Sequence, residues 1–151
     1  MRRDLASAVS LDATPETVWQ WLHDLPAWAD WNPVIPEIEG TLETAGRLRL
    51  RLELPDARPR RLEAEVMRVL PRQELSWILR LAVPGLLDCE HRFLLQGPEH
   101  DGEIHGCRLI QRLRISGILV PFVWHRLRKQ LGTALRDSNA GLKAAVASLP
   151  F

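Results

Sequence analysis

The 151-residue chain has no tyrosine, two cysteines and two lysines. Two cysteines cannot form the disulfide framework of a small secreted domain, so we expect Cys89 and Cys107 to be free thiols in a reducing compartment. The absence of tyrosine excludes the phenol group, a common proton donor, from any catalytic scheme. A catalytic site in this protein would therefore need another side chain as its proton donor.

The sequence also has little net charge and no long apolar run. Twenty Lys and Arg against nineteen Asp and Glu leave a formal net charge of +1, which gives no field to attract nucleic acid. Apolar runs such as residues 118–124 are far shorter than the ~20 residues that span a bilayer. The start Met1-Arg2-Arg3-Asp4 is not followed by the apolar region of a secretory signal. We expect a cytoplasmic protein with neither nucleic-acid binding nor stable membrane insertion.

The start of the chain predicts one strand followed by two short helices. Large and small side chains alternate over residues 5–11, as in a strand. Thr14 can cap a helix that begins at Pro15, because the first helical position needs no N–H donor. A second short helical turn over residues 27–31 would end before Asn32-Pro33.

From residue 34 to residue 116, apolar side chains recur at every second position, which is the period of a strand. Turn signals containing glycine or proline separate these runs, so successive strands should form an antiparallel meander. The six expected strands cover residues 34–42, 47–52, 62–70, 75–82, 87–96 and 104–116.

The C-terminal segment returns to helical spacing. Its apolar residues lie three, four or seven positions apart, Pro121 fits the first turn, and Leu149-Pro150 marks the end. The apolar residues are Val120, Val123, Leu127, Leu131, Leu135, Leu142 and Val146. The element order predicts one α+β domain over residues 1–151. In it, a curved antiparallel sheet of about seven strands wraps around the long C-terminal helix.

Short motifs occur in a fixed order along almost the whole chain. They are residues 13–19, residues 28–33, Glu74-Leu75-Ser76-Trp77, Glu90-His91-Arg92-Phe93 and Asn139-Ala140-Gly141-Leu142-Lys143. Together they resemble the polyketide cyclase/dehydrase-like (SRPBCC) family of the START-like, or Bet-v-1-like, helix-grip superfamily. The resemblance implies an apolar cavity between the sheet and the long helix. It also implies a small hydrophobic ligand such as a lipid, an isoprenoid or a polyketide-like aromatic compound.

The two strands before the long helix supply the best candidate for ligand recognition. If a three-residue loop His100-Asp101-Gly102 joins them, His91 lies opposite Gln111 with Cβ atoms within about 5.5 Å. The same register places Phe93 opposite Leu109 and Cys89 opposite Leu113. His91 and Gln111 would then be polar groups on an otherwise apolar concave wall. They either orient a ligand or simply satisfy each other as buried polar groups.

The remaining candidates are apolar side chains that would cover the body of the ligand. Trp77 faces inward with Leu75 and Leu79 on its strand, and Trp124 near the start of the long helix can close one end of the cavity. For each tryptophan, ordinary core packing is the competing interpretation. The predicted ligand-binding set is Trp77, His91, Phe93, Leu109, Gln111, Leu113 and Trp124.

Cys89 and His91 are separated by one residue, and so are His105 and Cys107. Such spacing of His and Cys suggests a metal site. The expected register places Cys89 and His91 roughly 13 Å or more from His105 and Cys107, at ~3.3 Å per strand residue. Zinc ligands lie about 2.0–2.3 Å from the metal, so these pairs cannot share one ion. We expect no metal site and no cofactor.

Three functions stay open from the sequence. The leading one is binding of a small hydrophobic molecule. The second is a cyclase or dehydratase reaction with His91 as general acid/base, since no other catalytic group is apparent. The third is a protein-interaction or quinone-chaperone module. The catalytic residues, if any, are unknown.

Overall fold

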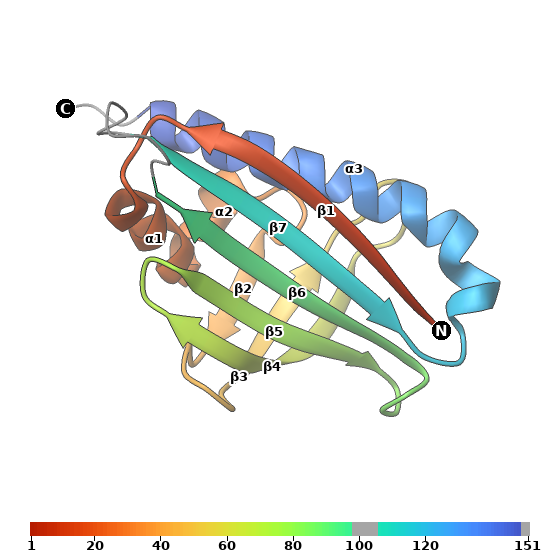
Figure 1. Ribbon diagram of the computed structural model, residues 1–151. Coiled ribbons are helices and arrows are strands. Elements are labelled where there is room, and N and C mark those ends of the chain that lie inside the picture. The colour runs from red at the N-terminus through yellow and green to blue at the C-terminus, as the bar shows by residue number, and fades with distance from the viewer. Residues whose placement is uncertain (98–105, 149–151) are drawn as a thin grey trace.

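The computed structural model describes residues 1–97 and 106–148. Its strands form one seven-stranded antiparallel sheet in the order β1-β7-β6-β5-β4-β3-β2. The strands are β1 (Arg2–Leu11), β2 (Glu37–Gly40), β3 (Arg47–Leu52), β4 (Arg60–Leu70), β5 (Glu74–Leu81), β6 (Leu87–Gln96) and β7 (Cys107–Ser116). The prediction of a curved sheet with a long C-terminal helix is confirmed (Figure 1).

Short helices occupy the connection between β1 and β2. They are α1 (Pro15–His23), the 3₁₀ turn η1 (Leu25–Ala27) and α2 (Trp28–Trp31). The Oγ1 atom of Thr14 accepts a hydrogen bond from the N–H of Thr17 at 3.2 Å, which caps α1 as predicted. The long helix α3 (Val120–Ala147) lies across the concave side of the sheet, behind β1 and β7 in Figure 1.

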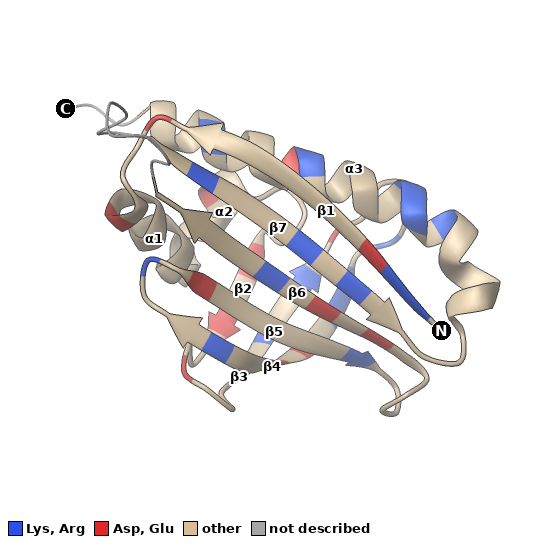
Figure 2. Ribbon diagram, in the orientation of Figure 1, with Lys and Arg blue, Asp and Glu red and all other residues tan. Residues whose placement is uncertain are grey.

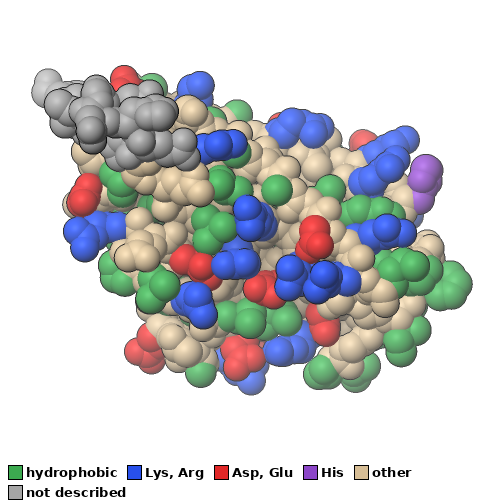
Figure 3. Space-filling model, viewed as in Figure 1, with side chains coloured by type: hydrophobic (Ala, Val, Ile, Leu, Met, Phe, Trp, Pro, Cys, Tyr) green, Lys and Arg blue, Asp and Glu red, His purple; other side chains and the backbone are tan. Residues whose placement is uncertain are grey.

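The two faces of the sheet differ as the alternation predicts. The inner face carries the buried core, with Leu48, Val66, Trp77 and Leu109 almost fully covered. Figure 2 shows both acidic and basic side chains on β5 and β6, and only basic ones on β7. The space-filling view of the outer face shows blue and red side chains interspersed with green ones, without a patch of one sign (Figure 3). Arg108, Arg112 and Arg114 of β7 are all exposed and therefore belong to a solvated outer surface.

Ion pairs link neighbouring strands across this outer face. Arg92 lies 3.0 Å from Glu74, and Arg114 lies 3.1 Å from Asp4. Met67 stands at a bulge in the pairing of β4 with β5, where the register shifts between Val66 and Arg68. A bulge increases the local twist and so helps the sheet to curl over α3.

The register of β6 and β7 differs from the predicted one by two residues. Gln111 pairs with Phe93 rather than with His91, and His91 pairs with Leu113. Cys89 pairs with Ile115, and Leu95 with Leu109. A shift of two keeps every side chain on its predicted face, so the alternation pattern cannot detect it. The loop His100-Asp101-Gly102, on which the prediction depended, lies outside the described residues.

A close approach fixes the second half of α3 against α2. At Gly141, a Cβ atom would collide with the backbone carbonyl oxygen of Trp31, so only glycine lets the two helices meet at this distance. Leu142, the next residue, is completely buried. This contact fixes the position of α3 relative to the sheet. It therefore also fixes where Ser138 and Asn139, within the preceding turn, face the sheet.

Candidate functional site

A cavity of about 170 Å³ lies between the concave face of the sheet and α3. Leucine is the commonest residue in its wall. Leu62, Leu79 and Leu113 come from the sheet, and Leu127, Leu131 and Leu135 come from α3. Exposed residues, Arg60 among them, also border it. The wall of the cavity is thus predominantly apolar.

One hydrogen bond closes the cavity on the side of the segment between β3 and β4. The Nε2 atom of Gln130 on α3 donates to the backbone carbonyl oxygen of Pro55 at 3.1 Å. Leu54, beside Pro55, lines the cavity, as does Leu127 on α3. Movement of this segment away from α3 would enlarge the cavity and break that one bond.

A buried polar network lies on the closed wall of the cavity. His91 Nε2 lies 2.8 Å from Gln111 Oε1. The amide nitrogen of Gln111 donates to Ser138 Oγ at 3.1 Å and to Asn139 Oδ1 at 2.7 Å. These four residues join β6, β7 and α3, and all are at most 9% exposed. Gln111 makes three hydrogen bonds, so its polar groups are satisfied in the core.

Burial controls the ionisation of the two titratable groups on this wall. Burial lowers the pKa of His91 to about 4, opposed by the hydrogen bond to Gln111. Burial, and then the nearby charge of Glu90, raises the pKa of the Cys89 thiol to about 12. At neutral pH the wall therefore carries a neutral imidazole and a neutral thiol, and no charge.

An aromatic cluster fills the space beside the cavity. The rings of His91 and Phe93 stack with centroids 4.3 Å apart, and Trp77 meets His91 edge to face at 5.3 Å. Trp28 contacts Trp31, Trp77 and Phe93 with centroids 4.9, 5.7 and 5.6 Å away. Neither Phe93 nor any of these tryptophans lines the cavity. The imidazole thus stands at the boundary between a filled core and a hollow one.

The structure separates the predicted ligand-binding residues into two groups. His91, Gln111 and Leu113 line the cavity, and the network brings His91 and Gln111 into direct contact despite the shifted register. Trp77, Phe93 and Leu109 are completely buried in the core and do not line it. Trp124 is half-buried and packs with Leu113, Ile115, Val120 and Leu135 in a second core cluster.

The sequence analysis missed Ser138, Asn139 and Asn32. The signal for the first two was present, because Ser138 and Asn139 occupy the positions of the apolar stripe between Leu135 and Leu142. Two polar residues on a stripe that faces the core require buried partners, and Gln111 supplies them. Asn32 lines the cavity from the turn after α2.

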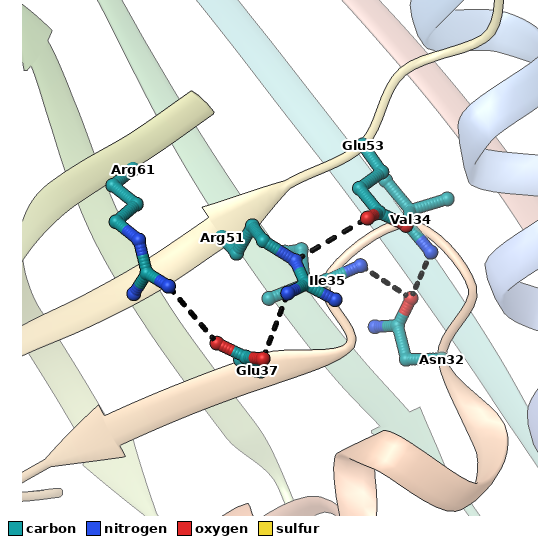
Figure 4. A network of polar contacts seen from close by, with 7 residues as sticks. All are labelled: Asn32, Val34, Ile35, Glu37, Arg51, Glu53 and Arg61. Carbon is teal, nitrogen blue, oxygen red and sulfur yellow. Dashed lines mark hydrogen bonds and ion pairs between the residues drawn. The ribbon is translucent and has the colours of Figure 1, made fainter. Parts of the chain in front are cut away.

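Asn32 also organises the turn that leads into β2. Its Oδ1 atom accepts hydrogen bonds from the N–H groups of Val34 at 2.9 Å and Ile35 at 3.0 Å (Figure 4). An asparagine that binds the backbone two or three residues ahead in this way stabilises a tight turn. Val34 and Ile35 then line the cavity beside it.

A second, wider hollow of about 590 Å³ lies over the outer side of β2, β3 and β4. Its charged side chains bind one another. Arg51 contacts Glu37 at 2.8 Å and Glu53 at 3.3 Å, and Arg61 contacts Glu37 at 3.7 Å (Figure 4). Because Arg51 and Arg61 of this groove are paired with carboxylates, whereas the cavity beside α3 has a predominantly apolar wall, that cavity is the better candidate for a binding site.

The possible metal ligands lie apart in the described residues. Cys89 pairs with Ile115 near one end of β7, whereas Cys107 pairs with Leu11 at the other end. Within residues 1–97 and 106–148, no group of three or more His, Cys, Asp or Glu side chains is arranged to hold a metal ion. His105 lies outside these residues. None of the helices described there has the length and apolar character to cross a bilayer.

The family follows from the sequence as a whole. A model of the family described as polyketide cyclase/dehydrase and lipid transport matches residues 2–147. The chain belongs to this family. The curved sheet and the long helix α3 are therefore those of a polyketide cyclase/dehydrase and lipid transport family member. A search of curated proteins finds no match.

Solved structures show the same fold at low sequence identity. The Zhui aromatase/cyclase from Streptomyces sp. R1128 matches with a TM-score of 0.78 and 11% identity, over 97% of this chain and 94% of that chain. A START superfamily protein from Mycobacterium smegmatis matches with a TM-score of 0.74 and 21% identity, over 97% and 99%. The protein TTHA0849 from Thermus thermophilus matches with a TM-score of 0.73 and 17% identity, over 97% and 100%. At these identities the likeness concerns the fold alone.

Proposed function

We propose that the protein binds a small hydrophobic molecule, such as a lipid, an isoprenoid or a polyketide-like aromatic compound, in the cavity between the sheet and α3. The observation that carries this proposal is a leucine-lined hollow whose closed wall ends on the His91–Gln111 pair. Burial of apolar ligand surface contributes about 25 cal/mol per Å². The few polar groups on such a wall fix the orientation of a ligand.

The roles of the site residues follow from their positions. Leu113, Leu131 and Leu135 would contact the body of the ligand, and His91 with Gln111 would meet its polar end. The prediction that Trp77, Phe93, Leu109 and Trp124 touch the ligand stays a prediction. In the present shape of the cavity, the first three support the wall from behind.

The size of the cavity limits the ligand. An apolar cavity of about 150 Å³ accommodates benzene. A cavity of about 170 Å³ therefore accepts one ring or a short branched chain. A longer ligand requires the segment around Leu54 and Pro55 to move away from α3, which breaks the bond from Gln130.

An aromatase/cyclase reaction is the second candidate, because Zhui carries that name. Its general base would be His91. An efficient base has a pKa near the working pH, and burial holds the pKa of His91 at about 4. The half-buried Cys89 thiol, with its pKa raised to about 12, is a poor nucleophile. This electrostatic environment favours binding over catalysis.

Native mass spectrometry of protein purified from its own host, followed by extraction of the retained molecule, tests the proposal. Ala134→Phe introduces a ring at a buried position that lines the cavity. Ala140→Phe makes the same change at an exposed position of the same helix and serves as the matched control. We expect a hydrophobic molecule in the natural protein and in Ala140→Phe, and none in Ala134→Phe.

Equal amounts of the same molecule in all three proteins would place it outside the cavity and contradict the proposal. Release of a chemically altered molecule on incubation would instead support the cyclase alternative. His91→Phe would then abolish that conversion while leaving the cavity accessible.

A further inference from the structure

The directions of the hydrogen bonds around Gln111 determine where the proton of His91 lies. The amide nitrogen of Gln111 donates to Ser138 Oγ and to Asn139 Oδ1, which uses both of its protons. Its carbonyl oxygen can only accept, and it faces His91 Nε2 at 2.8 Å. Nε2 must therefore carry the proton.

The other ring nitrogen of His91 then holds a lone pair. Burial lowers the pKa of His91 to about 4, so the ring carries one proton at neutral pH. With that proton on Nε2, Nδ1 is a hydrogen-bond acceptor.

This lone pair is open to the cavity. Within residues 1–97 and 106–148, Nδ1 of His91 has no hydrogen-bond partner. Some side-chain atoms, such as Trp77 Nε1, have no hydrogen-bond partner and are fully enclosed by the protein. Nδ1 of His91 is not one of these enclosed atoms. The rings of Trp77 and Phe93 pack against the imidazole, and His91 also lines the cavity, so we place the accessible Nδ1 on the cavity side.

The other polar side chains on the closed wall already take part in hydrogen bonds. Asn32 Oδ1 accepts from the N–H groups of Val34 and Ile35. Ser138 Oγ accepts one hydrogen bond from Gln111 and keeps its own proton to donate. The remaining neighbours of His91 along the wall, Cys89 and Leu113, offer a neutral thiol and an apolar chain. A ligand at this end of the cavity therefore meets one acceptor that makes no hydrogen bond, Nδ1 of His91.

We infer that the cavity selects a ligand whose polar end is a hydrogen-bond donor, an alcohol or a phenol, which donates to Nδ1 of His91. A ketone, an ether or an ester of the same skeleton has only acceptors and would place its oxygen against the lone pair. This inference rests on the proposed function, because it names the class of molecule that the same cavity takes.

The first test needs no ligand and no variant. Long-range ¹H–¹⁵N correlation spectra of the imidazole nitrogens report which nitrogen carries the proton. We expect the His91 signals of a ring protonated on Nε2, with an unprotonated Nδ1. An Nδ1–H form would mean that the amide groups of Gln111 and Asn139 are turned round. That result overturns the inference even if the cavity binds hydrophobic molecules.

The second test compares three probes of one ring, namely phenol, anisole and toluene, by titration followed in backbone amide spectra. Phenol donates a hydrogen bond, anisole only accepts, and toluene does neither. We expect the affinity of phenol relative to toluene to fall about 3- to 10-fold in His91→Phe, the range of one net hydrogen bond. His23→Phe, the same change at an exposed histidine of α1, should leave the ratio unchanged.

The outcomes separate the inference from the proposed function. Binding of all three probes with the same phenol-to-toluene ratio in the natural protein and in His91→Phe overturns the inference and leaves the cavity as a binding site. Binding of anisole in preference to phenol also overturns it. Failure of all three probes to bind at Leu113 and Ala134 overturns the proposed function and the inference with it.

Discussion

The concave side of the sheet contains two regions that differ in what fills them. The strands of both regions show the same alternation of apolar and polar residues. In one, Trp28, Trp31, Trp77 and Phe93 pack ring against ring with centroids 4.9–5.7 Å apart. In the other, leucines of the sheet and of α3 face each other across about 170 Å³ of free space. Both regions are apolar, so hydrophobicity does not distinguish them.

The difference is one of side-chain size against the curvature of the sheet. Near α2, the tryptophan rings of α2 pack against the sheet and fill the space that the curl leaves. Toward the first half of α3, the facing residues are leucines, with Ala134 in place of a large side chain. Leucine and alanine side chains are smaller than tryptophan rings, so they leave a hollow between α3 and the curved sheet. A hollow with one polar wall is suited to binding a ligand rather than to stabilising the fold.

Trp28→Ala should have the largest effect, because it removes a completely buried ring from the filled region and the bond from its Nε1 to the Leu22 carbonyl oxygen. We expect a loss of about 3–5 kcal/mol in the free energy of unfolding, measured by urea denaturation. Leu131→Ala, at a half-buried wall of the hollow, should cost less than about 2 kcal/mol. Equal losses would contradict the distinction between the two regions.

The imidazole at the boundary between the two regions should make stability depend on pH. Burial lowers the pKa of His91 to about 4 from the ordinary 6.5. Between pH 4 and pH 6.5, the imidazole is therefore protonated in the unfolded chain but neutral in the folded chain. Stability should therefore fall as the pH drops from 6.5 to 4. The loss amounts to about 3 kcal/mol from this group.

Comparison with His91→Phe isolates that contribution from the carboxylates, which titrate in both proteins. We expect the natural protein to lose about 3 kcal/mol more than His91→Phe between pH 7 and pH 4, by urea denaturation at each pH. His23→Phe, at an exposed histidine, should follow the natural protein. Parallel pH profiles for the natural protein and His91→Phe would mean that the imidazole is accessible to water and protonates freely.

Gln111→Leu should cost about 2–3 kcal/mol, because it leaves His91 Nε2–H and Asn139 Oδ1 buried without partners. In the double variant His91→Phe with Gln111→Leu, one unpaired donor disappears together with its acceptor. We expect the double variant to be less destabilised than the sum of the two single variants, by about 1–2 kcal/mol. Strict additivity in chemical denaturation would argue that the two side chains do not bind each other in solution.

The sequence predicted the elements and their faces well, because period two and period 3.6 record which side of each element is buried. Residues 47–52 and 87–96 became strands with the predicted bounds. The predicted register of β6 and β7 was wrong by two residues. A slip of two residues changes which residues pair but leaves every side chain on the same face of the sheet. The His91–Gln111 contact survives the slip, since long side chains also reach diagonal neighbours.

The hollow could not be located from the sequence. Trp77 and Leu79 lie on the same face of β5, yet the first packs in the aromatic cluster and the second lines the cavity. Alternation gives the face of a residue but not the distance to the element across from it. That distance depends on the curl of the sheet and on where Gly141 lets α3 approach α2. Ser138 and Asn139 could have been identified, since polar residues on an apolar stripe require a partner.

The smallest effect should come from added volume, and it tests the hollow directly. Ala64 on β4 and Ala134 on α3 are both buried, but only Ala134 lines the cavity. Ala64→Leu must displace packed neighbours and should cost about 1–3 kcal/mol in the free energy of unfolding. Ala134→Leu can place its added carbons in the free space and should change stability by less than about 1 kcal/mol while weakening phenol binding. If both substitutions cost the same, α3 closes onto the sheet in solution and the two regions are equally filled.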